Sequence, residues 1–339
     1  MLQGQPLVSD QELLTTPLRV LSKATGIPRS TLWGRRKALI GLEVGPAEGL
    51  KRELPEDNET LLSEVASLAE RLLQERGEYK ASFNLSEETR PIGLAFTGDW
   101  HVGGIGVDYR RLYSDVQALA SFPSGLYIFG MGDYGDNYKA SAGRASAGLY
   151  DAVLPNPDDQ QRVWEALLSK LGPKLLGLTL GCHLDWDFYR SGHDPLAGVC
   201  EKLNVSNFGH GAAVSVTVGT QKYSGLIRHR LPGESALSTT NPQRRATNEY
   251  PTSDPFDFIA LGHRHFNDLQ VRSVSGQQRV WLRSGSYKVW DRYAQSLGGY
   301  VGEPGVPVLI LYPQTRKMLA FWGGHLTEAL EYLRRLREE

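Results

Sequence analysis

Cysteine is scarce in this chain, and a long apolar run is missing. Only Cys182 and Cys200 occur among 339 residues, which excludes a disulfide scaffold and leaves either thiol free to bind a metal. No segment approaches the about 18 apolar residues that a membrane-spanning helix needs. Residues 1–10 also lack the basic and apolar regions of a signal peptide. We therefore expect a cytoplasmic protein that does not enter a membrane.

A net charge is nearly absent as well, because 37 Lys and Arg residues offset 38 Asp and Glu residues. Net charge therefore argues neither for nor against a polyanionic partner, but the charges are unevenly distributed. Residues 15–40 contain no acidic residue and six basic ones: Arg19, Lys23, Arg29, Arg35, Arg36 and Lys37.

Residues 15–40 also have the pattern of two short helices joined by a turn. Leu18 and Leu21 share one helical face, Gly26 permits a tight turn, and Pro28 suits the start of a second helix that carries Leu32. This pattern resembles a helix-turn-helix, in which the second helix enters the major groove of DNA. The alternative is a small helical hairpin that packs on another domain or partner, with solvated basic residues.

The predicted recognition helix spans residues 29–37. In the DNA-binding interpretation, its first side chains face base edges and its last ones lie nearer the phosphates. The base-facing residues are Arg29, Ser30, Thr31 and Arg35, and the phosphate-facing ones are Arg36 and Lys37.

A polar, proline-containing linker over residues 43–59 precedes an amphipathic helix predicted over residues 60–78. Its apolar face consists of Leu61, Leu62, Val65, Leu68, Leu72 and Leu73. We expect this helix to dock on the following domain. The alternative is a homodimer formed through a short coiled coil. The helix contains too few heptads to distinguish docking from dimerisation.

The most informative stretch is residues 92–104, where an apolar run ends in a glycine and is followed by Asp99 and His101. The run predicts a buried strand, and ligands collect at the carboxyl ends of such strands. If the chain stays extended, the two side chains point the same way and can share one metal ion.

Four more strand-like runs end in polar residues that suit metal ions. The run 125–130 precedes Asp133, Asp136 and Asn137, and the run 175–180 precedes Cys182, His183 and Asp185. The run 222–228 ends at His229, and the run 256–261 is followed by His263 and His265. Five of the eight histidines therefore lie just past predicted strands, which isolated structural histidines do not explain.

The five blocks DWH, GDYGDN, GCHLD, HRLPG and GHRH, in this order, resemble the calcineurin-like metallophosphoesterase superfamily over residues 91–324. The resemblance implies an α+β fold, a four-layer double β-sandwich flanked by helices. Here a small, all-helical helix-turn-helix module would precede it. The expected domains are the module (1–52), the linker and amphipathic helix (53–90), the catalytic domain (91–325) and a C-terminal helix (326–339).

The resemblance also implies two divalent metal ions. One would be held by Asp99, His101, Asp133 and His265, and the other by Asp133, Cys182, His229 and His263. Mixed carboxylate and imidazole ligands suit Mn²⁺, the expected ion, or Zn²⁺ or Fe²⁺. His183 resembles the family's non-ligand catalytic histidine, Asp136 the carboxylate that orients it, and Asn137 a phosphate contact.

The third block departs from the family. Cys182 stands where the family has asparagine, and Leu184 is inserted before Asp185. Cys182 therefore either binds metal as a thiolate or, if Leu184 displaces the turn, points into the core. His210 is the rival of His229, which we prefer because it ends a strand-like run.

Three loops are expected to shape a substrate groove: residues 138–149, residues 235–252 with Arg244 and Arg245, and residues 286–301, whose aromatic side chains could stack on bases. Together with the basic N-terminal segment, they favour a phosphodiesterase or nuclease acting on DNA, as in a phage or mobile element. The alternatives are a phosphomonoesterase acting on protein or nucleotide, and a DNA-binding regulator whose phosphoesterase fold is weak or inactive.

Overall fold

The computed structural model describes residues 18–25, 80–137, 152–185, 194–233, 239–249, 256–274, 276–292 and 302–338, with isolated residues 8, 32, 57, 59–60, 62–63, 65–67 and 295. The chain divides into two compact units, Met1–Glu75 and Arg76–Glu339. None of the helices in the described part is long and apolar enough to cross a membrane.

The first unit is described only in part. Helix α2 spans Leu18–Thr25, and the buried side chains of Val8, Leu21 and Leu32 form one small apolar cluster. All six predicted DNA-contacting residues lie outside the described residues. Of the predicted helix 60–78, residues 60, 62–63 and 65–67 are described and are helical. The helix-turn-helix, its DNA contacts and the docking of the second helix therefore stay predictions.

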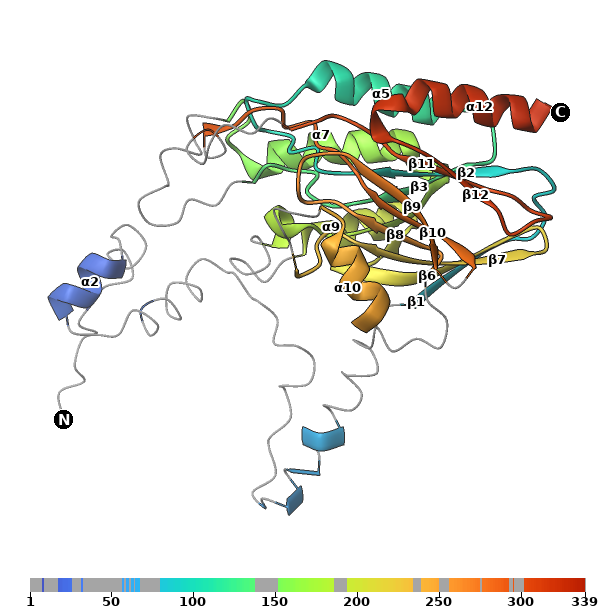
Figure 1. Ribbon diagram of the computed structural model, residues 1–339. Helices are drawn as coiled ribbons and strands as arrows, with labels where there is room; N and C mark the ends of the chain where they lie inside the picture. Colours follow the sequence, from blue (N-terminus) through green and yellow to red (C-terminus); the bar gives the residue numbers. More distant parts are fainter. Residues whose placement is uncertain are drawn as a thin grey trace. The chain divides into compact units, whose positions relative to one another are not determined.

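The second unit is built on two mixed six-stranded sheets, as the expected α+β double sandwich requires. One sheet has the order β1-β6-β7-β8-β10-β9 and the other β12-β11-β2-β3-β4-β5 (Figure 1). The strands of the first sheet are β1 (Lys80–Leu85), β6 (Gly211–Val218), β7 (Gln221–Arg228), β8 (Phe258–Leu261), β10 (Gln277–Arg283) and β9 (Asp268–Val274). Those of the second are β12 (Met318–Phe321), β11 (Val308–Leu311), β2 (Ile92–Thr97), β3 (Leu126–Gly130), β4 (Leu175–Leu178) and β5 (Ser206–Asn207).

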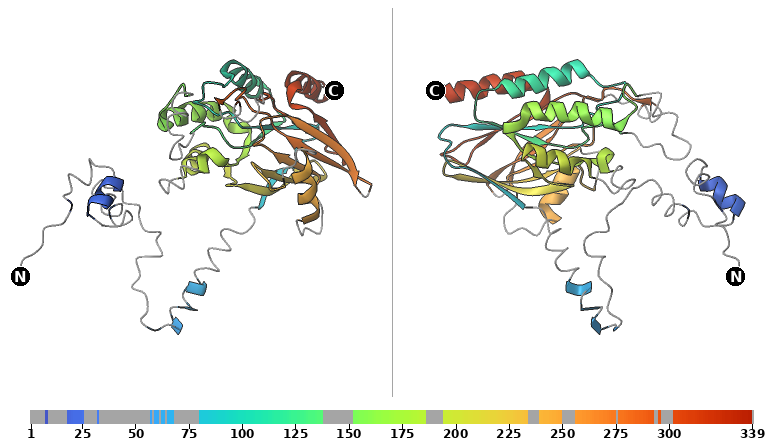
Figure 2. Two further views of the ribbon diagram at one scale, coloured as in Figure 1. Left: turned by 60° about the vertical axis from the view of Figure 1, so that its left-hand side comes forward. Right: turned by 180° about the vertical axis from the view of Figure 1, so that it is seen from behind.

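Helices cover the outer faces of the two sheets. Four of them pack over the β2 sheet: α5 (Tyr109–Ser121), α7 (Pro157–Leu171), α9 (Pro195–Leu203) and α12 (Leu326–Glu338). Helix α10 (Asn241–Glu249) places Ala246 against Ile259 and Trp281 on the outer face of the other sheet. Figure 2 shows α5, α7 and α12 together on one side of the sheets. Short 3₁₀ turns, η2 (Gly172–Lys174) and η3 (Gly323–His325), precede β4 and α12.

Period-two alternation divides the apolar side chains of β2 between two cores. Leu94 and Phe96 lie in the core between the sheets, whereas Ala95 faces the helices. Phe96 stacks on Phe129 of β3 and meets Phe258 of the opposite sheet edge-on. Because both faces of β2 are covered, all six of its residues are buried.

The five strands predicted from residues 92–104, 125–130, 175–180, 222–228 and 256–261 are confirmed as β2, β3, β4, β7 and β8. Strand β1 was not predicted, although it pairs in parallel with β6. Its sequence KASFNL alternates polar and apolar residues, as a half-buried edge strand does. The sheet core therefore begins before residue 91.

Candidate metal centre

Six strands direct their carboxyl ends to one edge of the sandwich. In one sheet β2, β3 and β4 are parallel neighbours, and in the other β7, β8 and β10 are parallel neighbours. The segments that follow these strands carry every residue that the sequence predicted for the site. Asp99 and His101 follow β2, Asp133, Asp136 and Asn137 follow β3, Cys182 and His183 follow β4, His229 follows β7, and His263 and His265 follow β8.

The backbone at this edge is in an unusual conformation. Among the described non-glycine residues, seven have a positive φ angle, and six of these are predicted site residues: Asp99, His101, Asp133, Asn137, His263 and His265. Such left-handed positions are uncommon for residues with a Cβ and cluster at functional sites. The extended conformation expected for Asp99 to His101 is therefore wrong, because φ is 48° and 49° at these residues.

The convergence of Asp99 and His101 nevertheless holds, because hydrogen bonds tie their loop to the loop after β3. The Asp99 N–H donates to the Gly132 carbonyl at 2.8 Å, and the His101 N–H donates to the Asp133 carbonyl at 3.0 Å. Gly181, with φ of +79°, lets a third loop approach, since a Cβ there would lie 2.1 Å from the Asp133 nitrogen.

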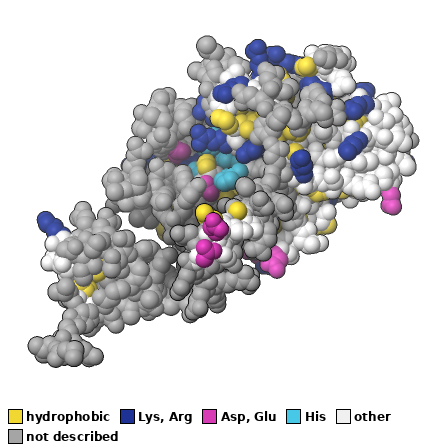
Figure 3. Space-filling model, turned by 90° about the horizontal axis from the view of Figure 1, so that it is seen from below, with side chains coloured by type: hydrophobic (Ala, Val, Ile, Leu, Met, Phe, Trp, Pro, Cys, Tyr) yellow, Lys and Arg dark blue, Asp and Glu magenta, His cyan; other side chains and the backbone are white. Residues whose placement is uncertain are grey.

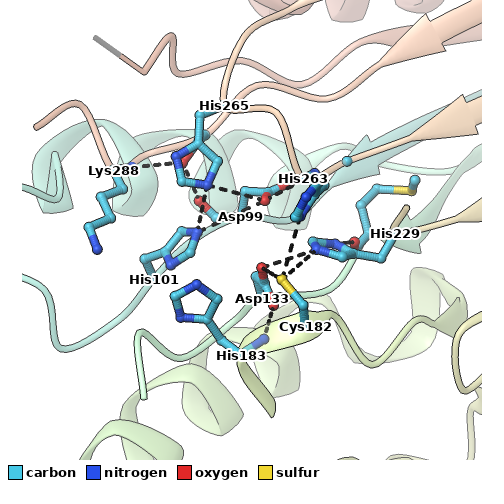
Figure 4. Close-up of polar contacts among 12 residues, drawn as sticks. Asp99, His101, Asp133, Cys182, His183, His229, His263, His265 and Lys288 are labelled. Atoms are coloured by element: carbon cyan, nitrogen blue, oxygen red, sulfur yellow. Dashed lines mark hydrogen bonds and ion pairs between the residues drawn. The ribbon is translucent and has the colours of Figure 1, made fainter. Parts of the chain in front are cut away.

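The first donor group consists of Asp99, His101 and His265, whose ligand atoms all lie within 4.8 Å of one another. The Nε2 atoms of His101 and His265 are 2.9 Å apart, and Asp99 Oδ1 lies 3.6 Å from His265 Nε2 (Figure 4). Asp99 and His101 are fully buried. Two imidazole nitrogens and a carboxylate therefore face one small volume.

The second donor group consists of Asp133, Cys182, His229 and His263, which meet the same 4.8 Å limit. Cys182 Sγ lies 3.2 Å from Asp133 Oδ2 and 3.5 Å from both His229 Nε2 and His263 Nδ1. The other ring nitrogen of His229, Nδ1, lies 2.8 Å from the Met131 carbonyl. With Nδ1 donating to that carbonyl, Nε2 faces the group and can offer its lone pair to a cation once it has lost its own proton.

The structure separates the two alternatives for Cys182. Residues 182–185 form a helical turn, and the Asp185 N–H donates to the Gly181 carbonyl at 3.3 Å. Residues two apart in a helix point to opposite sides. Leu184 is therefore buried in the core below the β2 sheet, while Cys182 faces the donor group. The inserted leucine does not turn the cysteine away.

Asp133 lies where the two groups meet. It belongs to the second group and also to a third cluster with His101 and His183. Its Oδ1 accepts from the His183 N–H at 2.7 Å, and its Oδ2 lies 3.1 Å from His229 Nε2. Burial alone would raise the pKa of Asp133, but the neighbouring His229 and His183 hold this pKa well below its usual range. The carboxylate is therefore ionised.

Three of the clustered histidines are neutral: His101 and His265 of the first donor group and His263 of the second. Burial, together with the charge of His183, lowers the pKa of His101 to about 4. Burial also lowers the pKa of His263 to about 3 and holds that of His265 well below its ordinary value. At neutral pH these three rings are therefore neutral and offer lone pairs. Buried lone pairs that face one another repel unless a proton or a cation lies between them.

The donor set fits divalent transition metals. Mixed imidazole, carboxylate and thiolate donors suit Zn²⁺, Fe²⁺ or Mn²⁺ better than Mg²⁺ or Ca²⁺, which prefer all-oxygen shells. The two donor groups together contain the seven residues that the sequence predicted as ligands.

Asp136 lies between two histidines, and its carboxylate is closer to His101 than to His183. Its carboxylate Oδ1 lies 3.1 Å from His101 Nδ1 but 3.9 Å from His183 Nδ1. It is the backbone carbonyl of Asp136 that accepts from His183 Nδ1. The carboxylate therefore contacts His101 more closely than His183, and the expectation that it orients His183 stays a prediction.

Asn137 lies beside this loop and is buried. Its N–H donates to Gln160 Oε1 of α7 at 2.8 Å. Gln160 in turn donates to the Leu154 carbonyl at 2.7 Å. The amide of Gln160 thus connects the end of the β3 loop to the segment before α7, a contact that no local pattern indicated.

Lys288 is the polar residue near the site that sequence reasoning missed. It lies in the segment after β10, is 8% exposed, and donates to Asp136 Oδ1 at 2.8 Å. Burial alone would lower the pKa of Lys288, but Asp136 and Asp291 raise it above its ordinary value. Lys288 lies in residues 286–301, which the sequence predicted to shape the substrate groove through aromatic side chains.

Two expectations for the groove segments are corrected. Tyr287 is fully buried and donates to Asp115 Oδ2 at 2.8 Å, so its ring is not available to stack on a base. Arg244 and Arg245 lie on helix α10 and not in a loop, although both are exposed. Residues 138–149 lie outside the described residues.

The rival histidine lies outside both groups. The His210 side chain is 65% exposed and its Nε2 is 3.9 Å from Asp185 Oδ1. On the face seen in Figure 3, histidine side chains gather in a hollow with Lys and Arg side chains beside it. Arg230 and Arg264, which follow His229 and His263 in sequence, are exposed. An anionic ligand would find cationic side chains close to the donor groups.

No protein-family profile and no curated protein sequence matches the chain. Solved structures that resemble it include a double mutant of Vps29 from Entamoeba histolytica (12% identity, TM-score 0.35, 68% of this chain and 99% of that one). A second is a conserved, predicted phosphoesterase from Streptococcus pneumoniae TIGR4 (12%, 0.32, 68% and 98%). A third is GAP50, the anchor in the inner membrane complex of Plasmodium (10%, 0.37, 69% and 84%). With TM-scores below 0.5, these similarities support no conclusion about activity.

Proposed function

We propose that the chain is a dinuclear metal-dependent phosphoesterase of the calcineurin-like type. The observation that carries this proposal is the pair of buried donor groups that meet at Asp133, with His183 beside them. Two divalent cations held there would acidify a water and neutralise charge on the attacking and leaving oxygens of a displacement at phosphorus. Mn²⁺ is the ion we propose, with Zn²⁺ and Fe²⁺ as alternatives that a thiolate ligand would favour.

Residues beside the donor groups would supply proton transfer and substrate binding. His183 Nδ1 is held by the Asp136 carbonyl, which directs Nε2 away from that carbonyl as the atom that can carry a proton to the leaving oxygen. Asp133 fixes the backbone of the same residue, because its carboxylate accepts from the His183 backbone N–H at 2.7 Å. The ring is thus oriented without being part of either complete ligand set. Arg230 and Arg264 attract the anionic substrate.

For the substrate we propose a phosphodiester, and DNA in particular. The support is the basic, acid-free segment 15–40, together with the burial of Leu21 and Leu32 in one cluster, as two packed helices would require. In this proposal the N-terminal unit delivers DNA to the phosphoesterase unit. A phosphomonoesterase and a DNA-binding regulator with a weak or inactive site are the competing functions.

The test is a metal-resolved activity panel. The metal-free protein is reconstituted with Mn²⁺, Zn²⁺ or Fe²⁺ and assayed on bis-p-nitrophenyl phosphate, p-nitrophenyl phosphate and single- and double-stranded DNA. We expect two metals per chain and a preference for the diesters. Asp133→Asn should abolish activity, while His210→Ala, which changes an exposed histidine outside the donor groups, should leave it intact.

The competing functions give different results in the same panel. A preference for the monoester would favour a phosphomonoesterase. DNA binding by a fully metal-loaded protein that hydrolyses none of the substrates would favour the regulator. A wild-type protein that takes up no divalent metal would contradict the proposed function altogether.

A further inference from the structure

Lys288 is a buried cation with two carboxylate neighbours. Its Nζ lies 2.8 Å from Asp136 Oδ1 and 3.5 Å from Asp291 Oδ2, while its side chain is 8% exposed. A lysine is almost never this buried unless it is paired. Figure 4 shows its side chain beside His101, at the margin of the first donor group.

The backbone of Lys288 is fixed to the same loop that carries Asp99. The Lys288 N–H donates to Ser286 Oγ at 3.0 Å, and Ser286 Oγ donates to the Asp99 carbonyl at 2.9 Å. Lys288 also forms an isolated antiparallel bridge with Val107, on the chain just beyond His101. The backbone that carries the ammonium group is therefore fixed by hydrogen bonds to neighbouring segments.

One carboxylate oxygen joins Lys288 to His101. Asp136 Oδ1 accepts from Lys288 Nζ and, at 3.1 Å, from His101 Nδ1. With its proton on Nδ1, the neutral His101 ring directs the Nε2 lone pair toward His265 and Asp99. His183 Nδ1 lies farther from this oxygen, at 3.9 Å, and donates instead to the Asp136 backbone carbonyl.

We propose that Lys288 is a positioning residue for the first donor group. It anchors the Asp136 carboxylate on His101, so that Asp136 serves metal binding at that group and not the proton transfer by His183. This inference rests on the proposed function, since it takes the donor groups as metal sites.

The experiment compares Lys288→Met and Asp136→Asn with Lys222→Met, which removes an exposed lysine of β7 as the matched control. Each metal-free protein is titrated with Co²⁺, and bound metal is counted by mass spectrometry after dialysis. Loss of an outer partner of a metal-ligating histidine lowers metal affinity by about 10- to 100-fold. We expect that loss for one of two metals in both variants, and none in Lys222→Met.

The Co²⁺ spectrum shows which metal is lost. A cysteine-to-cobalt charge-transfer band reports on the group that contains Cys182, so this band should persist in Lys288→Met while the second equivalent of Co²⁺ binds weakly. A protein that carries both Lys288→Met and Asp136→Asn should bind Co²⁺ no more weakly than either single variant, because both substitutions break the same contact. Lys288→Arg, which keeps the charge, should recover part of the affinity.

Two results would overturn the inference. The first is a Lys288→Met protein that binds both metals with the affinity of wild type. The other is an Asp136→Asn protein that keeps both metals and loses kcat most for esters with poor leaving groups, which would make Asp136 the partner of His183. If Lys288→Met does not fold by circular dichroism, Asp136→Asn carries the same test. Failure of the wild-type protein to bind metal would instead remove the proposed function as well.

Discussion

Replacing Cys182 changes how metal binding depends on pH. In the metal-free protein, burial and the nearby Asp133 raise the pKa of the Cys182 thiol to about 11. The thiol is therefore protonated at neutral pH, but it must lose its proton to ligate a cation. Cys182→Asn puts a neutral amide in its place and has no such proton to lose.

The size of the effect follows from the distance between the pH and this pKa. A solution at about pH 8 lies roughly three pH units below the pKa of this thiol. Each unit corresponds to about 1.4 kcal/mol, so ionising the thiol opposes metal binding by roughly 4 kcal/mol. Each unit of pH increase removes about 1.4 kcal/mol of this cost. The logarithm of the association constant should therefore rise with pH more steeply in wild type than in Cys182→Asn, by about one unit of slope.

Isothermal titration calorimetry with Zn²⁺ in buffers of different ionisation enthalpy measures the protons released. His229, whose pKa Asp133 raises well above its ordinary value despite burial, releases a proton in both proteins. The difference between them should therefore be close to one proton per chain. Cys182→Ala should lose close to one metal, whereas Cys182→Asn should keep two and respond better to Mn²⁺. Equal proton release in wild type and Cys182→Asn would refute the assignment of Cys182 as a ligand.

Three further outcomes are expected. His183→Ala should lower kcat by about 10²-fold or more with two metals retained, and a metal-free variant in elemental analysis would show that His183 holds metal. Deleting residues 1–52 should leave diester hydrolysis intact but flatten the salt dependence of DNA binding by about one unit of log–log slope per lost phosphate contact; an unchanged slope would make this segment a packing module. Leu184→Ala should lower the free energy of unfolding by about 2–5 kcal/mol in denaturant titrations, because Leu184 is buried in the core; a variant as stable as wild type would contradict the account of the turn.

Local patterns located five of the six strands whose carboxyl ends meet at the site, all but β10. Continuous apolar runs predicted β2 and β8, because a strand covered on both faces has no polar side to reveal. Strand β1 was missed because its alternating sequence lies among polar residues, and only pairing with β6 makes it a strand. The carboxylates and histidines were found because each follows a strand directly.

Contacts between distant segments could not be read in the same way. Lys288 lies 152 residues from Asp136 in sequence, and no local pattern marks a lysine that a remote carboxylate will hold. Asp136 contacts His101 through its carboxylate and His183 through its backbone carbonyl. Which group meets which histidine depends on how three loops pack together. The left-handed backbone at Asp99 and His101 likewise follows from hydrogen bonds to the neighbouring loop.

The sequence by itself determined which residues could bind metal and that each follows an apolar strand, because apolar runs and the side chains after them are local properties. Tertiary structure decided whether Leu184 or Cys182 faces the core, since only the packing of the helical turn against that core chooses between them. It also decided which carboxylate each histidine contacts. Such contacts depend on angstrom-scale approaches between loops that the chain brings together only when both sheets have formed.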